Sequence, residues 1–109
     1  MQINIKTSAS NQAIVSALAQ KLPGGARENI IARVALGYSL ASGKRFQRNE
    51  FNSYDSQGKE YKESFLFSDY RDLYVALICQ AYGINKNNEL IPKYVKLHID
   101  HGLEQINYL

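Results

Sequence analysis

Apolar and polar residues alternate over residues 2–6, and the pattern then becomes helical. Ile3 and Ile5 fall on one side of the alternation, which predicts a short strand with one apolar face. Apolar residues next recur at the spacing of one helix face: Ile14, Ala17, Leu18 and Leu22. Candidate caps for this helix are Thr7, Ser8 and Ser10. The segment Pro23-Gly24-Gly25 predicts the end of the helix.

A second helix is predicted over about residues 26–42, ending before Gly43. Its main apolar stripe consists of Ile31, Val34, Ala35 and Tyr38, widened by Ile30, Leu36 and Leu40. Because few positions are clearly polar, we expect this helix to be buried against more than one neighbour. Gly37 costs about 1 kcal/mol relative to alanine in mid-helix. We therefore expect a close helix–helix crossing at Gly37.

Residues 44–62 show no sustained helical period, and their polar residues alternate with aromatic ones. We interpret this stretch as a long loop with a turn at residues 55–58. Tyr61 and residues 65–67 are predicted to be short extended pieces. A loop of this length in a small domain is usually functional or mobile.

Two more helices are predicted in the C-terminal half. The first is expected to be capped by Ser68 and to end at Gly83, with the strongest helical period in the chain: Tyr70, Leu73, Tyr74, Leu77, Ile78 and Ala81. The last runs from about residue 89 or 90 to 108, with one apolar face made of Ile91, Val95, Ile99, Gly102, Leu103 and Ile106. The predicted fold is mainly α, in one domain with a β-α-α segment (1–43), a loop (44–67) and a helical pair (68–109).

Composition narrows the class of protein. The chain has 109 residues, of which 45% are hydrophobic and 21% charged, so we expect one folded domain. A single cysteine excludes an internal disulfide and suits a reducing cytoplasm. We see no signal peptide and no apolar run long enough to span a bilayer, so no membrane partner is expected.

No set of residues predicts catalysis. Cys79 lies in an apolar segment with no adjacent cation, so we expect a buried, inert thiol. His98 and His101 share a helix face, but two histidines at this spacing are weak support for a metal site. No carboxylate pair stands out as a general acid and base. We therefore assign no catalytic residue, no metal ligand and no cofactor.

Charge is unevenly distributed along the chain. Residues 1–62 hold nine basic and four acidic side chains, a balance of +5, whereas residues 63–109 hold four and six, a balance of −2. Chance in a small sample is one explanation. The other is a surface for an anionic partner, since the basic residues of the 44–62 loop are interleaved with Phe46, Phe51, Tyr54 and Tyr61. An ordinary solvated loop with core aromatics remains the alternative.

The order strand, helix, turn, helix within residues 2–43 is that of ribbon-helix-helix proteins. In that fold the strands of two subunits pair and their outward residues enter the major groove. The outward residues here would be Gln2, Asn4 and Lys6, whose side chains suit base edges. Backbone N–H groups of Gly25, Ala26 and Arg27 would suit a phosphate. This pattern favours a repressor or antitoxin as an alternative function.

The chain resembles the DndE family, the small component of bacterial DNA phosphorothioation systems. The resemblance covers nearly the whole chain and is carried by the opening strand and helix, residues 27–40, Gly58-Lys59-Glu60-Tyr61, Phe65-Leu66-Phe67 and the two C-terminal helices. It implies a non-catalytic, oligomeric DNA-binding accessory that favours nicked duplex. It also implies that sulfur mobilisation lies in partner proteins of the system, a cysteine desulfurase and an iron–sulfur protein.

The resemblance supplies no site residue, so the DNA surface is our own inference. We predict that it is formed by Lys21, Arg27, Arg33, Lys44, Arg45, Arg48, Lys59 and Lys62. A dimer or tetramer is expected because the second and third helices carry more apolar surface than a chain of this size readily buries. A DNA-nicking enzyme is a further alternative, for which we find no metal site or nucleophile in the sequence.

Overall fold

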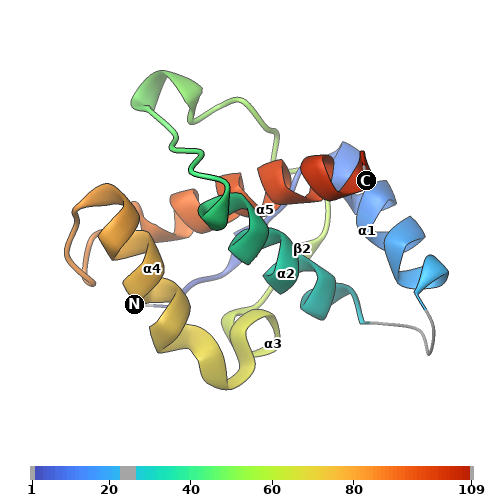
Figure 1. The fold of residues 1–109 in the computed structure, drawn as a ribbon, viewed down its shortest axis with the longest axis horizontal. Helices are drawn as coiled ribbons and strands as arrows, with labels where there is room; N and C mark the ends of the chain where they lie inside the picture. The colour runs from blue at the N-terminus through green and yellow to red at the C-terminus, as the bar shows by residue number, and fades with distance from the viewer. Residues whose placement is uncertain (1, 23–26, 109) are drawn as a thin grey trace.

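Helices dominate the structure. The computed structural model describes residues 2–22 and 27–108 and is shown in Figure 1. Its helices are α1 (Ala9–Lys21), α2 (Glu28–Ala41), α3 (Glu63–Phe67), α4 (Arg71–Tyr82) and α5 (Ile91–Asn107). Short 3-10 turns lie at Arg48–Glu50 and Ser68–Tyr70. The prediction of a mainly helical chain with four longer helices and a short N-terminal strand is confirmed.

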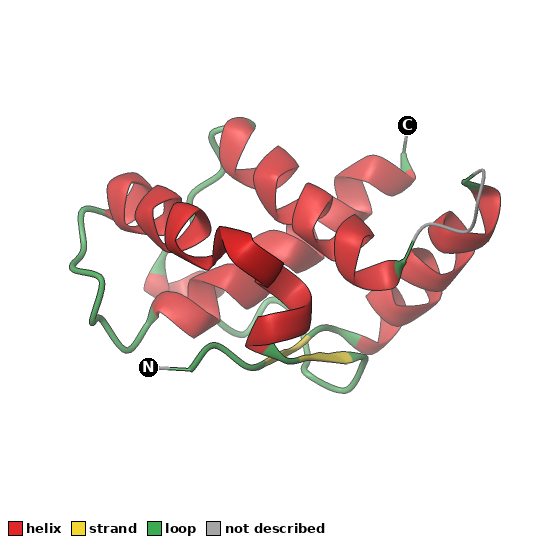
Figure 2. Cartoon of the chain, turned by 90° about the horizontal axis from the view of Figure 1, so that it is seen from below, coloured by secondary structure: helices red, strands yellow, loops and turns green. Residues whose placement is uncertain are grey.

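The N-terminal strand pairs within its own chain. Strand β1 (Ile5–Lys6) is antiparallel to β2 (Glu60–Tyr61), with Ile5 opposite Tyr61 (Figure 2). Gln2, Asn4 and Lys6 are exposed, and the Asn4 side-chain oxygen accepts a hydrogen bond from the Glu63 N–H at 3.1 Å. The ribbon between two subunits stays a prediction.

The start of α1 is fixed by hydrogen bonds to α5. Of the three candidate caps, Ser8 is the one used, because its hydroxyl accepts from the Asn11 N–H. The buried Asp100 carboxylate accepts from the Ser8 N–H at 3.0 Å and from the Asn11 amide at 2.8 Å, and it forms an ion pair with Lys96. The predicted stop at residues 23–25 lies outside the described residues.

The core forms where α2 crosses α5. A Cβ atom on Gly102 would lie 2.0 Å from the Ala35 carbonyl oxygen, whereas one on Gly37 would meet no heavy atom within 4 Å. The prediction of a close crossing at Gly37 was therefore wrong. Gly37 lies on the side of α2 turned away from α5, and Gly102 of α5 is the residue that lets the two backbones approach.

The predicted apolar stripes of α2 and α4 are rotated relative to the core. Val34 is 57% exposed and Leu73 is 54% exposed, while Leu36, predicted at the edge of its stripe, and Val75, outside the predicted stripe, are buried. We define the outer face by exposed apolar side chains on and beside these two helices: Ile30, Val34 and Tyr38 of α2, Leu73 and Leu77 of α4, and Tyr70 of the 3-10 turn that precedes α4. The sides are adjacent, because Gly37 and Leu77 line one hollow.

The connection between β2 and α4 differs from the prediction. Residues 65–67 form part of α3 rather than an extended piece, while Tyr61 is in a strand as predicted. Ser68 does not cap α4: it has a positive φ of 50° and ends α3, and α4 begins at Arg71. Gly83 ends α4 with a φ of 63°, as predicted. None of the described helices has the length and apolarity needed to cross a bilayer.

Candidate nucleic-acid interface

Six of the eight predicted cations gather at the two ends of α2. The start cluster consists of Arg27, Lys59 and Lys62, and the end cluster of Lys44, Arg45 and Arg48. Because α2 has 14 residues, its length places the two clusters about 20 Å apart. The outer face lies along α2 between them. Of the remaining two, Lys21 is exposed at the last residue of α1, and Arg33 is half-buried with its guanidinium 5.5 Å from the Tyr70 ring.

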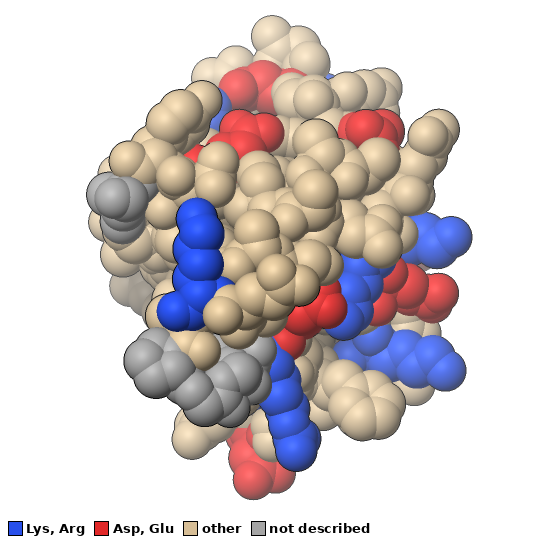
Figure 3. All heavy atoms as spheres, turned by 90° about the vertical axis from the view of Figure 1, so that its right-hand side faces the viewer, with Lys and Arg blue, Asp and Glu red and all other residues tan. Residues whose placement is uncertain are grey.

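In the start cluster, one of the three cations is paired with a carboxylate and the other two are exposed. The Lys59 ammonium lies 3.1 Å from a Glu28 carboxylate oxygen. Arg27, the N-cap of α2, and Lys62 are both exposed, and within the described residues no carboxylate is ion-paired with either. Figure 3 shows Lys and Arg side chains gathered over the lower half of the face that includes α1 and the start of α2. Gly25 and Ala26, whose N–H groups were predicted to bind phosphate, lie outside the described residues.

The end cluster is partly tied to its own loop. Lys44 pairs with Glu50 at 2.9 Å, and Glu50 also accepts from the Gln47 N–H. These two bonds hold the pKa of Glu50 below its usual value. Arg45 donates to the Leu40 carbonyl at 3.3 Å, at the C-terminal end of α2 where a cation is favoured. Arg48 is exposed in the 3-10 turn.

A partly buried chain of hydrogen bonds anchors this loop to three helices. The Phe46 N–H donates to the Tyr82 hydroxyl at 2.9 Å, and that hydroxyl lies 2.6 Å from His98 Nε2. Ser39 Oγ lies 2.7 Å from Nδ1 of both His98 and His101. The Phe46 ring packs edge-on against both imidazoles. The backbone beside Arg45 is thus held by contacts to α2, α4 and α5.

The number of protons on these side chains favours one direction of hydrogen-bond donation along the chain. Burial, followed by the nearby Arg45 charge, lowers the pKa of His98 to about 3, so its ring is neutral at pH 7. Ser39 has one hydroxyl proton and cannot donate to both Nδ1 atoms. Every hydroxyl proton finds an acceptor if Tyr82 donates to His98 Nε2, His98 Nδ1–H to Ser39, and Ser39 to His101. The His98 nitrogens are therefore both occupied by protein partners.

The loop aromatics are not free for stacking. Phe46 and Tyr61 are buried. Phe51 packs edge-on against Tyr94, and the Tyr54 hydroxyl donates to Glu104 at 3.1 Å. An exposed aromatic that the sequence did not indicate as a stacking candidate is Phe65 of α3, which is 68% exposed and lies beside the start cluster. Its exposure follows from the helix over residues 63–67, whereas the sequence predicted an extended piece at residues 65–67.

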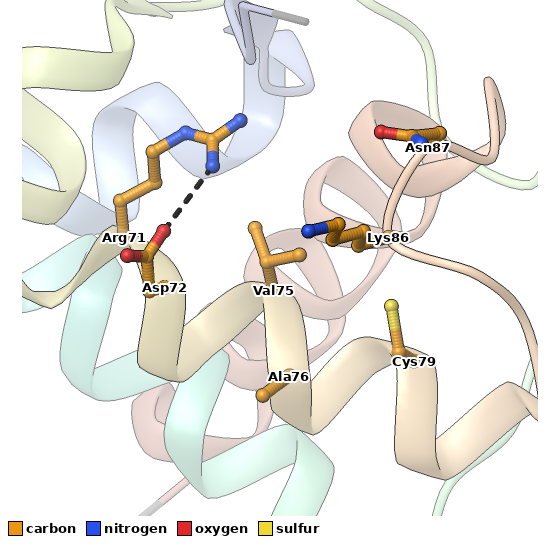
Figure 4. Close-up of a pocket in the computed structure, with 7 residues that line it drawn as sticks. All are labelled: Arg71, Asp72, Val75, Ala76, Cys79, Lys86 and Asn87. Atoms are coloured by element: carbon orange, nitrogen blue, oxygen red, sulfur yellow. Dashed lines mark hydrogen bonds and ion pairs between the residues drawn. The ribbon is translucent and has the colours of Figure 1, made fainter.

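Cys79 is half-buried rather than buried as predicted. Its thiol lines an open pocket of about 490 Å³ with Lys86 and Arg71, and Figure 4 shows Cys79 and Lys86 directed into it. Lys86 reaches the pocket from the α4–α5 connection, so it was not visible as a sequence neighbour. In the described part of the chain, no three His, Cys, Asp or Glu side chains gather closely enough to hold a metal ion.

Comparisons with known proteins agree with this fold. The structure is similar to the crystal structure of DndE from Escherichia coli B7A, a protein described as involved in DNA phosphorothioation modification, with a TM-score of 0.72 at 15% identity over 94% of this chain and 95% of that chain. A search of curated proteins finds no match. Residues 4–108 match the model of a family described as DNA sulphur modification protein DndE. The resemblance seen in the sequence is thereby confirmed, and the chain belongs to the DndE family.

Proposed function

We propose that the chain is a non-catalytic, DNA-binding accessory of a DNA phosphorothioation system. It binds backbone phosphates, favours nicked duplex, and acts in the cytoplasm as a homo-oligomer together with other proteins of that system. The observation that carries the proposal is the placement of cations at both ends of α2 in a member of the DndE family. Phosphates are the anions that such dispersed surface cations suit best.

The exposure of each cation indicates how much it can contribute to DNA binding in this proposal. Five are exposed, namely Lys21, Arg27, Arg45, Arg48 and Lys62. The other three are half-buried, and Lys44 and Lys59 are paired with carboxylates. A paired lysine exchanges one anion for another on binding DNA, so it contributes less than an unpaired cation. A separation of about 20 Å spans about six phosphates along one strand of a duplex, so both clusters of one subunit can contact one DNA segment.

The outer face supports the homo-oligomer. Its apolar side chains are exposed on α2 and α4, and the two helices line one hollow through Gly37 and Leu77. A second copy of the chain would cover this surface and leave both basic clusters at the rim. Such an assembly increases the number of phosphate contacts because each subunit adds its own basic clusters. A dimer or a tetramer satisfies this arrangement.

The direct test is a titration of purified protein against intact duplex, the same duplex with one nick, and the single strand. The proposal predicts binding that ignores sequence, weakens linearly with the logarithm of salt, and is tightest for the nicked duplex. Preference for one palindrome, lost on Asn4→Ala substitution, would instead support the ribbon-helix-helix alternative. Magnesium-dependent strand scission would support a nicking enzyme.

A further inference from the structure

A pocket lies between the start of α2 and the segment that runs from β2 into α3. Its volume is about 360 Å³, at the lower end of the range of about 300–1,000 Å³ for ligand pockets. The lining residues are Asn29, Lys59, Glu60, Tyr61, Lys62 and Phe65. We call this the β2–α3 pocket. Its size suits a single nucleotide rather than a stretch of duplex.

The apolar wall of the pocket is Phe65, held in place from α2. The Asn29 side-chain amide donates to the Phe65 carbonyl oxygen at 2.7 Å, which fixes the backbone of α3 against the first turn of α2. The Phe65 side chain is 68% exposed, whereas Tyr61 is 2% exposed and packs into the core. Phe65 therefore presents an aromatic ring to solvent in a pocket whose other aromatic residue, Tyr61, is part of the core.

Positive charge around the pocket is concentrated at Lys62. Lys59 is bound to Glu28 at 3.1 Å, and Glu60 contributes an exposed carboxylate. Lys62 is exposed, and no carboxylate among the described residues is ion-paired with it. A bound anion would therefore lie beside Lys62 and away from Glu60. The aromatic wall and this lysine come from α3 and its N-terminal neighbour.

We propose that the β2–α3 pocket takes one unstacked nucleotide of a DNA strand, its base on the Phe65 ring and its phosphate beside Lys62. Aromatic side chains stack on every base because each base has a π-face, and cations then hold the backbone. Nicked duplex supplies such a nucleotide at the frayed end, which intact duplex does not. The inference rests on the proposed function and explains how a nick would be distinguished from an unbroken backbone.

The experiment uses nicked duplex with 2-aminopurine as the 5′-terminal base at the nick. Stacking on Phe65 is expected to change the fluorescence of this base on binding. The Phe65→Ala protein should lose that change and bind nicked duplex about tenfold more weakly, while its affinity for intact duplex is unchanged. Phe65→Tyr should retain both, and Glu60→Gln should bind nicked duplex more tightly. Tyr108→Ala, at an aromatic residue that is 83% exposed, is the matched control and should have no effect.

Failure of the pocket and failure of the proposed function give different results. If wild-type protein binds none of the DNAs, the proposed function itself is wrong. If it binds nicked duplex and Phe65→Ala leaves both fluorescence and preference unchanged, the pocket assignment is overturned and DNA binding stands. A change of oligomeric state in Phe65→Ala would also overturn it, since Phe65 would then contact a second copy. Displacement of the DNA by an equal concentration of thymidine 5′-monophosphate would instead identify a free-nucleotide site and overturn it.

Discussion

The two sides of α2 perform different tasks. On the inner side, Ala35 contacts Gly102 of α5 so closely that no Cβ atom fits between them. On the outer side, Val34 and Tyr38 are exposed, and Gly37 lines one hollow with Leu77 of α4. Both sides are apolar, so hydrophobicity alone does not distinguish them. The inner side fixes the fold of one chain, whereas under our proposal the outer side contacts a second copy, with the basic clusters at the helix ends.

The largest expected effect is on the inner side. Gly102→Ala places a methyl group against the Ala35 backbone, and the two helices must separate to accept it. We expect a loss of about 3 kcal/mol or more in the free energy of unfolding, measured by urea denaturation. The matched variant is Gly37→Ala, whose methyl group meets open space. It should stabilise the protein by about 0.5–1 kcal/mol. Equal effects at the two glycines would refute the assignment of the crossing.

The buried histidine gives the inner side a pH dependence. The pKa of His98 is lowered to about 3, below its unfolded value of about 6.5, so the unfolded chain binds the proton first. The stability that His98 contributes is present above pH 6.5 and is lost as pH falls toward 3. Between pH 6.5 and 5 this loss is about 2 kcal/mol.

Denaturation curves across that pH range, on wild type and His98→Gln, measure this contribution. The variant should start less stable at pH 7 and show a shallower decline toward acid. Half-buried His101, whose pKa is also lowered by burial, remains in both proteins and accounts for part of the residual slope. The same slope in both proteins would remove His98 as the source.

A charged residue placed on the outer side should leave the fold of one chain intact and weaken the association of subunits. Leu73→Glu keeps the core of α4 intact because Val75 and Ile78 hold that helix in place. We expect unchanged helical circular dichroism and a dissociation constant of the oligomer raised by about tenfold or more, which corresponds to about 1.4 kcal/mol. Light scattering over a concentration series measures it. The control is Ala76→Glu, an exposed position of α4 that lines the Cys79 pocket. If both variants assemble like wild type, the outer face is not the contact.

The periodicity of apolar residues predicts where helices form, but it does not always predict which side of a helix packs into the core. The period of α4 predicted a helix but not which side packs, because Leu73 and Val75 are equally apolar and tertiary packing decides between them. The single apolar face of α5 was predicted in full and is almost wholly buried. The polar Lys96, His98 and Asp100 are buried as well. Lys96 and Asp100 have the i,i+4 spacing of a helical ion pair, but their other partners, and those of His98, lie far away in the chain, so the sequence does not indicate that these side chains are buried.

For the candidate interface, the sequence predicts which single residues are charged and exposed, but not how these residues are arranged in space. Arg48 and Lys62 are exposed, as charged residues in polar segments usually are. The pairing of Lys59 with Glu28 joins residues 31 positions apart and required the fold. Phe65 escaped notice because Phe65-Leu66-Phe67 has the pattern of a buried strand, whereas a short helix buries two of the three and exposes the first.

A smaller effect is expected at Cys79, which lies between the core and the solvent. Cys79→Ser places a hydroxyl in a half-buried position and should cost about 1 kcal/mol of stability or less. DNA binding and sulfur incorporation into DNA should be unchanged, because we propose a structural role for this thiol. Denaturation and a phosphorothioation assay in cells measure the two. A folded Cys79→Ser protein that abolishes phosphorothioation would assign this thiol a chemical role.

The salt dependence of DNA binding tests the central claim most directly. The Lys44/Arg45/Arg48→Ala protein, checked for folding and oligomeric state, is titrated with nicked duplex at several salt concentrations beside wild type and the exposed control Lys86→Ala. Each cation that contacts a phosphate contributes about one unit to the slope of log affinity against log salt. We predict a slope reduced by about two units for each subunit that contacts the DNA, mainly from Arg45 and Arg48 because Lys44 is paired with Glu50, and equal weakening for all sequences. An affinity and a slope both equal to those of wild type would contradict the account.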